Sequence, residues 1–234
     1  MGKRITQQAR GKGSLTFRVR PRAYKHKISY PPIHVEGKAK ITKLFSSAGH
    51  SAPLVEIKID NLKFIVPAAE GIFESQEIYI GKRDENQEPK IGDILKLNEI
   101  EQGTNVFNIE SIPGNGGRLL RSAGSSAVVV DKRDKIEIQI RRRRLKLHGN
   151  CRGVIGVVAG DGRLIKPIIK AGKRHHQMKA IGRKWHRTSA VKVNAVDHPF
   201  GSGRGKRIKS KIAKRNSPPG LKVGHIRPKR TGKK

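Results

Sequence analysis

The stretch Leu54-Val-Glu-Ile-Lys-Ile-Asp60 decides the fold class, because apolar and charged side chains alternate along it. In an extended chain its β-branched residues share one face and its charged residues share the other. The polar pair Asp60-Asn61 predicts a turn, after which Leu62–Val66 returns as a second strand. The sequence therefore predicts a β-hairpin with one buried face and one solvated face.

Short apolar segments of the same kind continue downstream, separated by glycine turns and polar loops. Strands are expected at Glu77–Ile80, Ile94–Leu97, Asn105–Glu110, Ala127–Val130, Ile136–Ile140, Leu145–Leu147, Val154–Val158 and Leu164–Ile169. No segment of about 12 residues in the middle of the chain has a helical apolar period, and a helical turn is expected only around Ala123 or Met178. This pattern predicts a mainly β protein with two small barrels, split near residue 88.

Charge is distributed very unevenly along the chain. Residues 1–30 hold nine Lys or Arg and no carboxylate, whereas residues 31–140 have a net charge of −2. Residues 141–234 hold 29 Lys or Arg and only two carboxylates, Asp161 and Asp197, which brings the whole chain to +34. Self-repulsion of this size disfavours compaction unless a polyanion supplies the counter-charge. A near-neutral body with cationic extensions is expected of a nucleic-acid-binding protein.

Several other classes are disfavoured. The single cysteine, Cys151, excludes an intramolecular disulfide and fits a reducing, cytoplasmic compartment. The basic start lacks the apolar region of a secretory signal, and no apolar run approaches the ~18 residues of a membrane-spanning helix. Glycine and proline interrupt every basic stretch, which disfavours a membrane-surface helix as well. No membrane partner is therefore expected.

The basic segments have features that suit contact with phosphates. Glycines in the N-terminal arm, which Pro31-Pro32 closes, and in the C-terminal extension let an irregular chain approach a crowded backbone. Each neutralised phosphate adds roughly 0.7–0.9 to the slope with which the logarithm of the binding constant falls as the logarithm of the salt concentration rises. The four arginines Arg141–Arg144 follow a predicted strand, and their side chains would alternate between its two sides if the chain stays extended. A phosphate clamp is favoured, because the arginine side chain binds phosphate through two hydrogen bonds. The alternative for this run is a solvated loop tip.

The segment Lys170–Trp185 mixes cations with His175, His176 and one tryptophan. Trp185 would either stack on a base or fill the edge of a barrel. The adjacent histidines lack cysteine partners or a second histidine at ligand spacing, so no metal site is predicted. No cofactor is predicted either, because Gly201–Lys206 is one residue short of a phosphate-binding loop.

Asp197-His198-Pro199 is the one constellation that could perform acid–base chemistry. A histidine beside a carboxylate can titrate near neutrality. A histidine hydrogen-bonded to RNA or to backbone is the favoured interpretation, so His198 remains a weak catalytic candidate and the chain is not predicted to be an enzyme.

Asn194-Ala-Val-Asp-His-Pro-Phe-Gly201 resembles a specific segment of the family of the universal second protein of the large ribosomal subunit. The resemblance covers essentially the whole chain. It continues in these segments: Gly2-Lys-Arg4, Thr16-Phe-Arg18, Asn108-Ile-Glu110, Lys170–Lys179, Gly182–Trp185, Pro218–Gly220 and Lys229–Gly232. Bacterial members usually have histidine where this chain has Phe200. Together with the short N-terminal arm, this difference resembles the archaeal or eukaryotic cytosolic branch.

The resemblance implies an oligonucleotide-binding (OB) fold barrel at 35–88 and a Src-homology-three-like barrel at 89–190. A basic arm at 1–34 and a basic extension at 191–234 would thread ribosomal RNA. It also implies a position near the peptidyl-transferase region for Asp197, His198 and Pro199, with roles in assembly, subunit association and tRNA placement. The implied partners are large-subunit rRNA, other large-subunit proteins and the small subunit, all in cytoplasmic ribosomes.

The residues expected to contact RNA are cations, rings, polar groups and glycines of the basic segments. They are Arg18, Arg20, Arg22, Arg141, Arg142, Arg143, Arg144, Lys173, Arg174, His175, His176, Lys179, Arg183, Lys184, Trp185, Arg187, Asn194, Asp197, His198, Pro199, Gly201, Gly203, Arg204, Lys206, Arg207, Lys214 and Arg215. Two competing functions remain open: a DNA-binding architectural protein, which charge alone does not distinguish, and a ribosomal catalyst that uses His198.

Overall fold

A computed structural model describes residues 2–81, 88–133, 135–203, 212–218 and 222–227. By its contacts the chain divides into two compact units. One unit, Arg20–Ile181, is here called the β unit. The other combines the two ends of the chain, Met1–Val19 and Gly182–Lys234, and is here called the terminal unit.

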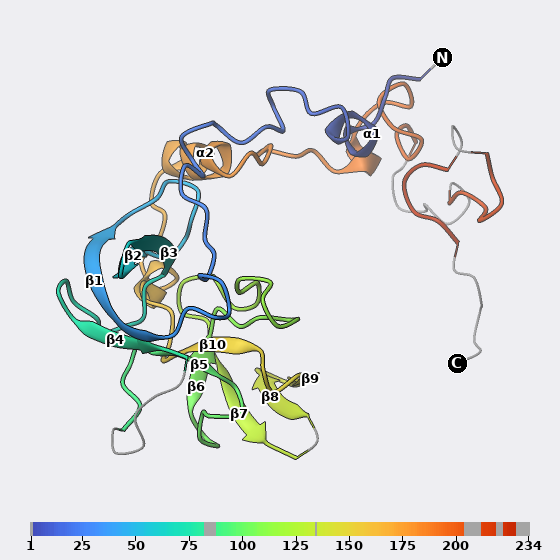
Figure 1. Ribbon diagram of the computed structural model, residues 1–234. Coiled ribbons are helices and arrows are strands. Elements are labelled where there is room, and N and C mark those ends of the chain that lie inside the picture. The colour runs from blue at the N-terminus through green and yellow to red at the C-terminus, as the bar shows by residue number, and fades with distance from the viewer. Residues whose placement is uncertain (1, 82–87, 134, 204–211, 219–221, 228–234) are drawn as a thin grey trace. The chain divides into compact units, whose positions relative to one another are not determined.

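The β unit contains one ten-stranded sheet with the strand order β3-β2-β1-β4-β5-β10-β6-β7-β8-β9 (Figure 1). Its strands are β1 Gly37–Phe45, β2 Leu54–Ile59, β3 Leu62–Pro67, β4 Glu77–Ile80, β5 Ile94–Lys96, β6 Asn105–Phe107, β7 Ala127–Asp131, β8 Ile136–Ile140, β9 Arg143–Leu147 and β10 Arg152–Ile155. Neighbouring strands are antiparallel except β4 and β5, which pair in parallel through Ile80 and Ile94. The prediction of a mainly β fold is confirmed.

The predicted hairpin is β2–β3, joined by a turn in which Asp60 has a positive φ of 49°. Its register pairs Val55 with Val66 and Ile57 with Phe64, and all four side chains are buried. The alternating pattern therefore places its apolar face in the core, as the period of two requires.

The apolar residues of the β unit form two hydrophobic clusters. The first gathers residues chiefly from β1–β4, among them Ile41, Ile57 and Ile78. The second gathers residues chiefly from the segment between β5 and β9, among them Leu97 and Ile138. Full burial of a side chain of this size contributes about 1.5–3 kcal/mol. The barrel types and the boundary near residue 88 stay predictions, although the two clusters fit two small cores.

Part of the predicted N-terminal arm packs onto this unit. Ile28 and Tyr30 are buried, and the Tyr30 hydroxyl donates to the carbonyl of Asn108 at 2.6 Å. The Pro31 carbonyl accepts from Arg152 Nη1 at 2.9 Å. These contacts fix residues 28–31 against the middle of the chain.

The local structure differs from the sequence predictions at two places. The predicted strand Leu164–Ile169 is wrong, because a 3₁₀ turn at Asp161–Arg163 precedes a turn whose apolar side chains are exposed. Strand β1 was missed, since lysines and small residues dilute its apolar face. The helical turn at Met178 is confirmed within α2 (Ala171–Ala180), whereas Ala123 lies in a non-helical turn.

The terminal unit has little regular structure, as the sequence predicts for the ends of the chain. The helical elements among its described residues are a five-residue helix α1 (Thr6–Arg10), which the sequence did not predict, and a 3₁₀ turn at Ala190–Lys192. No helix in the described part of the chain is long and apolar enough to cross a membrane.

Candidate nucleic-acid interface

The terminal unit is built by the first residues of the chain packing on the segment 184–198. The backbone N–H of Lys3 donates to the carbonyl of Val196 at 2.7 Å, and Ile5 is only 4% exposed. The side-chain oxygen of Gln8 accepts from the N–H of Ile5 at 3.0 Å, which supports the start of α1. Ile5, the apolar residue directly before α1, thus anchors an otherwise polar arm.

A turn positions the Asp197-His198-Pro199 segment. The carbonyl of Asn194 accepts from the backbone N–H groups of Asp197 and His198 at 3.0 and 3.2 Å. Phe200, directly after this turn, is 4% exposed, and its ring packs against those of His198 and His225, with centroids 4.8 and 5.4 Å apart. Phe200 is therefore the apolar centre around which this segment folds.

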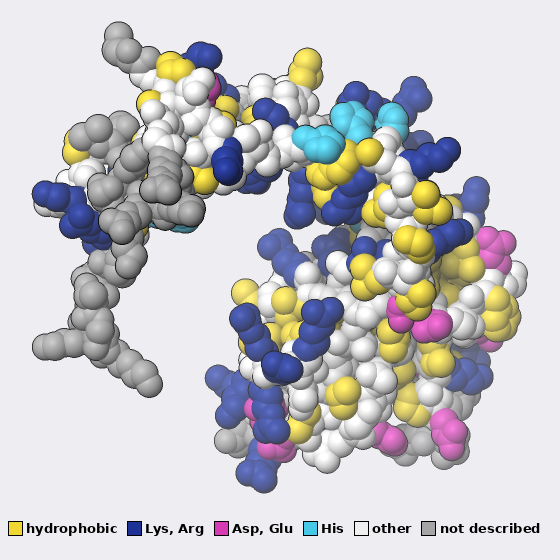
Figure 2. Space-filling model, turned by 180° about the vertical axis from the view of Figure 1, so that it is seen from behind, with side chains coloured by type: hydrophobic (Ala, Val, Ile, Leu, Met, Phe, Trp, Pro, Cys, Tyr) yellow, Lys and Arg dark blue, Asp and Glu magenta, His cyan; other side chains and the backbone are white. Residues whose placement is uncertain are grey.

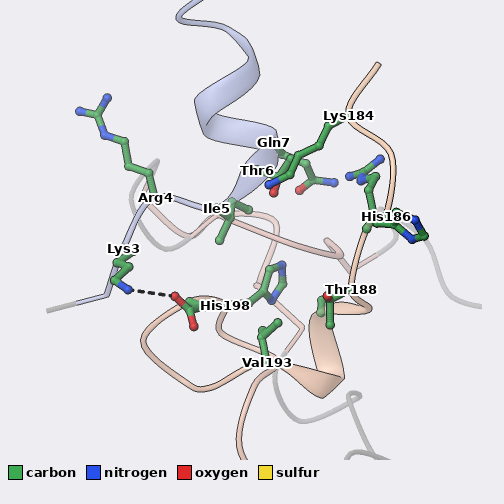
Figure 3. A pocket seen from close by; sticks show the side chains of 13 residues that line it. Lys3, Arg4, Ile5, Thr6, Gln7, Lys184, His186, Thr188, Val193 and His198 are labelled. Atoms are coloured by element: carbon green, nitrogen blue, oxygen red, sulfur yellow. Dashed lines mark ion pairs between the residues drawn. The ribbon is translucent and has the colours of Figure 1, made fainter. Parts of the chain in front are cut away.

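Side chains of the two segments face one another across a pocket of about 420 Å³ (Figure 3). Its lining is rich in cations and hydrogen-bonding groups over a few apolar side chains: Lys3, Arg4, Ile5, Thr6, Gln7, Lys184, His186, Arg187, Thr188, Ala190, Val193, Asp197 and His198. The pocket is here called the terminal pocket.

The terminal pocket is electropositive. Four of its lining residues are Lys or Arg, and Asp197 is the one carboxylate among them. That carboxylate forms an ion pair with the Lys3 ammonium at 3.4 Å, so its charge is already balanced within the protein. The remaining cations favour an anionic ligand.

His198 has a defined role in the hydrogen bonding of this turn. Its Nδ1 accepts from the backbone N–H of Phe200 at 3.0 Å, which assigns the neutral-ring proton to Nε2. Partial burial lowers the pKa of His198, and the nearby His225 lowers it further. The ring is thus held neutral near pH 7, as a hydrogen-bond donor through Nε2. In the described part of the chain, Asp197 pairs with Lys3 and makes no hydrogen bond to His198, so no Asp–His dyad forms.

Gly201 was predicted to allow close approach of a phosphate. Within the protein, a Cβ on this residue would lie 2.3 Å from the carbonyl oxygen of Asn194. The glycine therefore already serves the packing of the turn. Gly203 is different, because it has a positive φ of 83° and open space where a Cβ would stand.

The run Arg141–Arg144 does not continue strand β8 as one extended segment. Ile140 pairs with Arg143 across the β8–β9 hairpin, so Arg141 and Arg142 form its turn, with φ of Arg141 at 54°. The condition of an extended run is met only by Arg143 and Arg144, which lie in β9, whereas Arg141 and Arg142 form the tip of the hairpin. All four side chains are nevertheless exposed.

Helix α2 carries Lys173, Arg174, His175, His176 and Lys179 and contains no buried residue. Figure 2 shows histidine and cationic side chains gathered over this helix. The rings of the two histidines meet edge to face, with centroids 5.6 Å apart. Within the described ranges, no three His, Cys, Asp or Glu side chains are grouped so as to hold a metal ion.

The remaining predicted residues are distributed over both units. Trp185 is half-buried, and its ring lies against that of His186 with centroids 3.8 Å apart. The exposed members are Arg18, Arg20, Arg22, Arg183, Lys184, Arg187, Asn194, Pro199, Lys214 and Arg215. Arg204, Lys206 and Arg207 lie outside the described residues.

The structure brings four predicted residues, Lys184, Arg187, Asp197 and His198, together in the terminal pocket. The site residues that the sequence did not predict are Lys3, Arg4, Ile5, Thr6, Gln7, His186, Thr188, Ala190 and Val193. The basic start of the chain carried a signal for Lys3 and Arg4. The neutral residues carried none, because Thr and Gln acquire this role only through the fold.

Comparisons with known proteins agree with this picture. Residues 90–220 match the family model for Ribosomal Proteins L2, C-terminal domain. Over 99% of both chains, the protein is 41% identical to "Large ribosomal subunit protein uL2" of Archaeoglobus fulgidus. Proteins of the same name are 39% identical in Methanothermobacter thermautotrophicus and 36% identical in Sulfolobus acidocaldarius, each over at least 99% of both chains.

Proposed function

The chain belongs to the uL2 family of large ribosomal subunit proteins, in its archaeal branch, and we propose that it binds large-subunit rRNA as a structural constituent of the ribosome. The observation that carries this proposal is the cationic terminal pocket, whose only lining carboxylate is already paired with Lys3. A surface of this kind requires an external polyanion, and the relatives are named as ribosomal proteins.

The architecture we propose is an OB-fold barrel at 35–88 followed by a Src-homology-three-like barrel at 89–190. The second hydrophobic cluster lies wholly within 89–190 and supports this division, whereas the first also includes Ile94, Phe107 and Val154. The arm at 1–34 and the extension at 191–234 would supply the phosphate contacts, with help from α2 and the Arg141–Arg144 turn. The barrels would dock on folded RNA by shape, as is usual for structured RNA.

The proposed role is not catalytic. Among the described residues, no carboxylate orients His198, and its Nδ1 accepts from the backbone N–H of Phe200. We propose instead that the Asp197–Pro199 turn contributes to rRNA structure near the peptidyl-transferase region. Through that position the protein would support assembly, association with the small subunit and tRNA placement in cytoplasmic ribosomes. Contacts with other large-subunit proteins belong to the same proposal.

Deletion of residues 197–234 tests the role of the extension. The β unit makes its own hydrophobic contacts, so we expect the truncated chain to fold but to be missing from purified large subunits. Incorporation is measured by mass spectrometry of subunits from cells that express both tagged forms, and folding by circular dichroism. Truncated protein at full occupancy in the particles would refute the proposal.

The nature of the nucleic acid is tested separately. Crosslinking of the cellular protein, followed by sequencing of the recovered nucleic acid, should yield large-subunit rRNA. Recovery of chiefly duplex DNA would favour the architectural alternative.

A further inference from the structure

We propose that the terminal pocket holds one unstacked nucleotide of a single-stranded rRNA segment, rather than a phosphate group alone. This inference rests on the proposed function and deepens it, because it assigns a ligand class to one part of the interface. The cations that cover the rest of the molecule need only a phosphate backbone. The terminal pocket offers more than cations.

The size of the pocket is the first argument. A volume of about 420 Å³ lies within the range of ~300–1,000 Å³ that small-molecule sites occupy. A single phosphate group would leave most of this space unfilled, whereas a base with its sugar would occupy it. A base-paired nucleotide has its base inside a duplex, so the site requires an unstacked nucleotide.

The lining supplies a partner for each part of a nucleotide. Ile5, Ala190 and Val193 form an apolar wall, suited to the face of a base. Thr6, Gln7 and Thr188 offer neutral donors and acceptors, suited to base edges and sugar hydroxyls. Lys3 is paired with Asp197, and the other cations of the pocket, Arg4, Lys184 and Arg187, suit the adjoining phosphates.

His198 adds a donor with fixed direction. Since its Nδ1 accepts from the Phe200 N–H, its Nε2–H remains to donate to a ligand, and Nε2 has no partner in the described part of the chain. A base carbonyl or ring nitrogen would accept that hydrogen bond. Neutral donors of this kind distinguish bases, whereas ammonium groups chiefly fix the backbone.

Both walls are required, and they come from opposite ends of the sequence. Lys3–Gln7 and Lys184–His198 meet only because the N-terminal segment packs on the later one through Ile5 and the Lys3–Val196 hydrogen bond. Figure 3 shows Thr6 and Gln7 beside Lys184 on one side of the pocket and Thr188 and Val193 on the other. The pocket is thus a property of the folded terminal unit and of neither segment alone.

Two matched pairs of variants in the full-length chain separate a nucleotide site from a general cationic surface. Arg187→Gln and Arg183→Gln each remove one exposed arginine from the same segment, but only Arg187 lines the pocket. Thr188→Val and Ser189→Ala each remove a neighbouring exposed hydroxyl, and only Thr188 lines the pocket. Binding is measured by anisotropy with a labelled single-stranded ribo-octanucleotide of mixed sequence and with its duplex.

We expect Thr188→Val to weaken single-strand binding about threefold to tenfold, with an unchanged salt slope, because it removes a hydrogen bond and no charge. Ser189→Ala should leave binding unchanged. Both arginine variants should reduce the salt slope by roughly 0.7. The wild-type chain should bind the single strand more tightly than the duplex, and of the two arginine variants only Arg187→Gln should lose that preference. Adenosine monophosphate should protect the terminal unit from trypsin at concentrations at which inorganic phosphate does not.

The inference is overturned if Thr188→Val binds like Ser189→Ala, or if inorganic phosphate protects as well as the nucleotide. A wild-type tryptic pattern for the free variants, apart from the cleavage site that each arginine variant removes, excludes misfolding as the cause of a loss. The two proposals fail differently. Salt-dependent binding of rRNA with no difference within either pair contradicts only the nucleotide site, whereas no binding of rRNA by the wild-type chain contradicts the proposed function as well.

Discussion

At the scale of single residues, the Glu110–Arg152 ion pair holds the segment after β6 against strand β10. Glu110 is fully buried and accepts from the Arg152 side chain at 2.9 Å and from the N–H groups of Arg152 and Gly116 at 3.0 Å. Burial by itself would raise the pKa of Glu110, but these hydrogen bonds and the attraction of Arg152 outweigh it, so the pKa is lowered. The carboxylate therefore stays ionised in the core and fixes the Gly-rich loop that follows it.

Removal of one partner from this ion pair should strongly destabilise the folded protein. Arg152→Leu leaves a buried carboxylate without its cation, and we expect the free energy of unfolding to fall by about 3–5 kcal/mol in urea titrations. Lys63→Gln, which breaks the exposed Lys63–Glu56 pair, is the matched control. It should change the free energy of unfolding by less than ~1 kcal/mol. Equal effects of the two variants would contradict the structural role of the buried pair.

Lowering the pH should loosen the terminal unit through His198. Because the pKa of His198 is lowered in the folded unit, the unfolded segment binds a proton at a higher pH than the folded one does. The contribution of the neutral ring to the stability of the terminal unit is therefore present above the ordinary histidine pKa of about 6.5 and is lost as the pH falls below it. Tryptic cleavage within residues 182–203 should therefore accelerate between about pH 7 and pH 5.5, relative to an unstructured peptide. His198→Asn should remove part of this dependence, and His176→Asn on exposed α2 should leave it intact. A cleavage rate independent of pH would contradict this account of His198.

At the scale of elements, α2 is an isolated helix with little to stabilise it. Its ten residues are fewer than the ~12–15 that an isolated helix needs in water, and none of its side chains is buried. Lys173 and Arg174 lie in its first turn, where the positive end of the helix dipole disfavours cations. An anion bound at this end of the helix would offset the unfavourable interaction of these two cations with the helix dipole.

Two charge reversals test whether RNA completes α2. Lys173→Glu should raise the helicity of residues 171–180 in the free protein, because an acidic residue suits the first turn, whereas Lys179→Glu should lower it. Both should weaken RNA binding, since each exchanges a cation for an anion. Backbone chemical shifts report the helicity, and salt titrations report the binding. The same direction of helicity change in both variants would contradict the dipole argument.

The elements also show where sequence patterns succeed. Alternation with a period of two predicted the β2–β3 hairpin and the span of β8, because the apolar residues of the hairpin face the first hydrophobic cluster and those of β8 face the second. The same signal predicted a strand at Leu164–Ile169, but no neighbouring strand pairs with those residues in the described structure, and their side chains are exposed. Apolar content alone does not specify a pairing partner. The turn at Arg141 likewise follows from the register of β8 with β9, which the sequence does not state.

The positive charge of the site was predictable from the sequence, whereas its shape was not. The basic segments, and the scarcity of carboxylates among residues 141–234, pointed to nucleic acid. The pairing of Asp197 with Lys3, and the apolar role of Phe200 between two histidines, depend on contacts between distant segments. For the same reason, the neutral residues Thr6 and Thr188 carried no signal before the fold was known.

At the scale of the whole molecule, a net charge of +34 on 234 residues is the dominant fact. The β unit supplies the buried apolar clusters, and residues 141–234 supply most of the uncompensated charge. Ordering of such segments against a polyanion is accompanied by counterion release, which makes binding steeply dependent on salt. The central claim is therefore that ribosomal RNA completes the structure of this chain.

Sedimentation of native cell extract over a series of salt concentrations tests that claim most directly. We predict that the protein travels with the large ribosomal subunit at low salt, leaves it at high salt, and returns when the salt is lowered. A protein that stays at the top of the gradient at every salt concentration, with a rigid terminal unit that added rRNA does not alter, would contradict it.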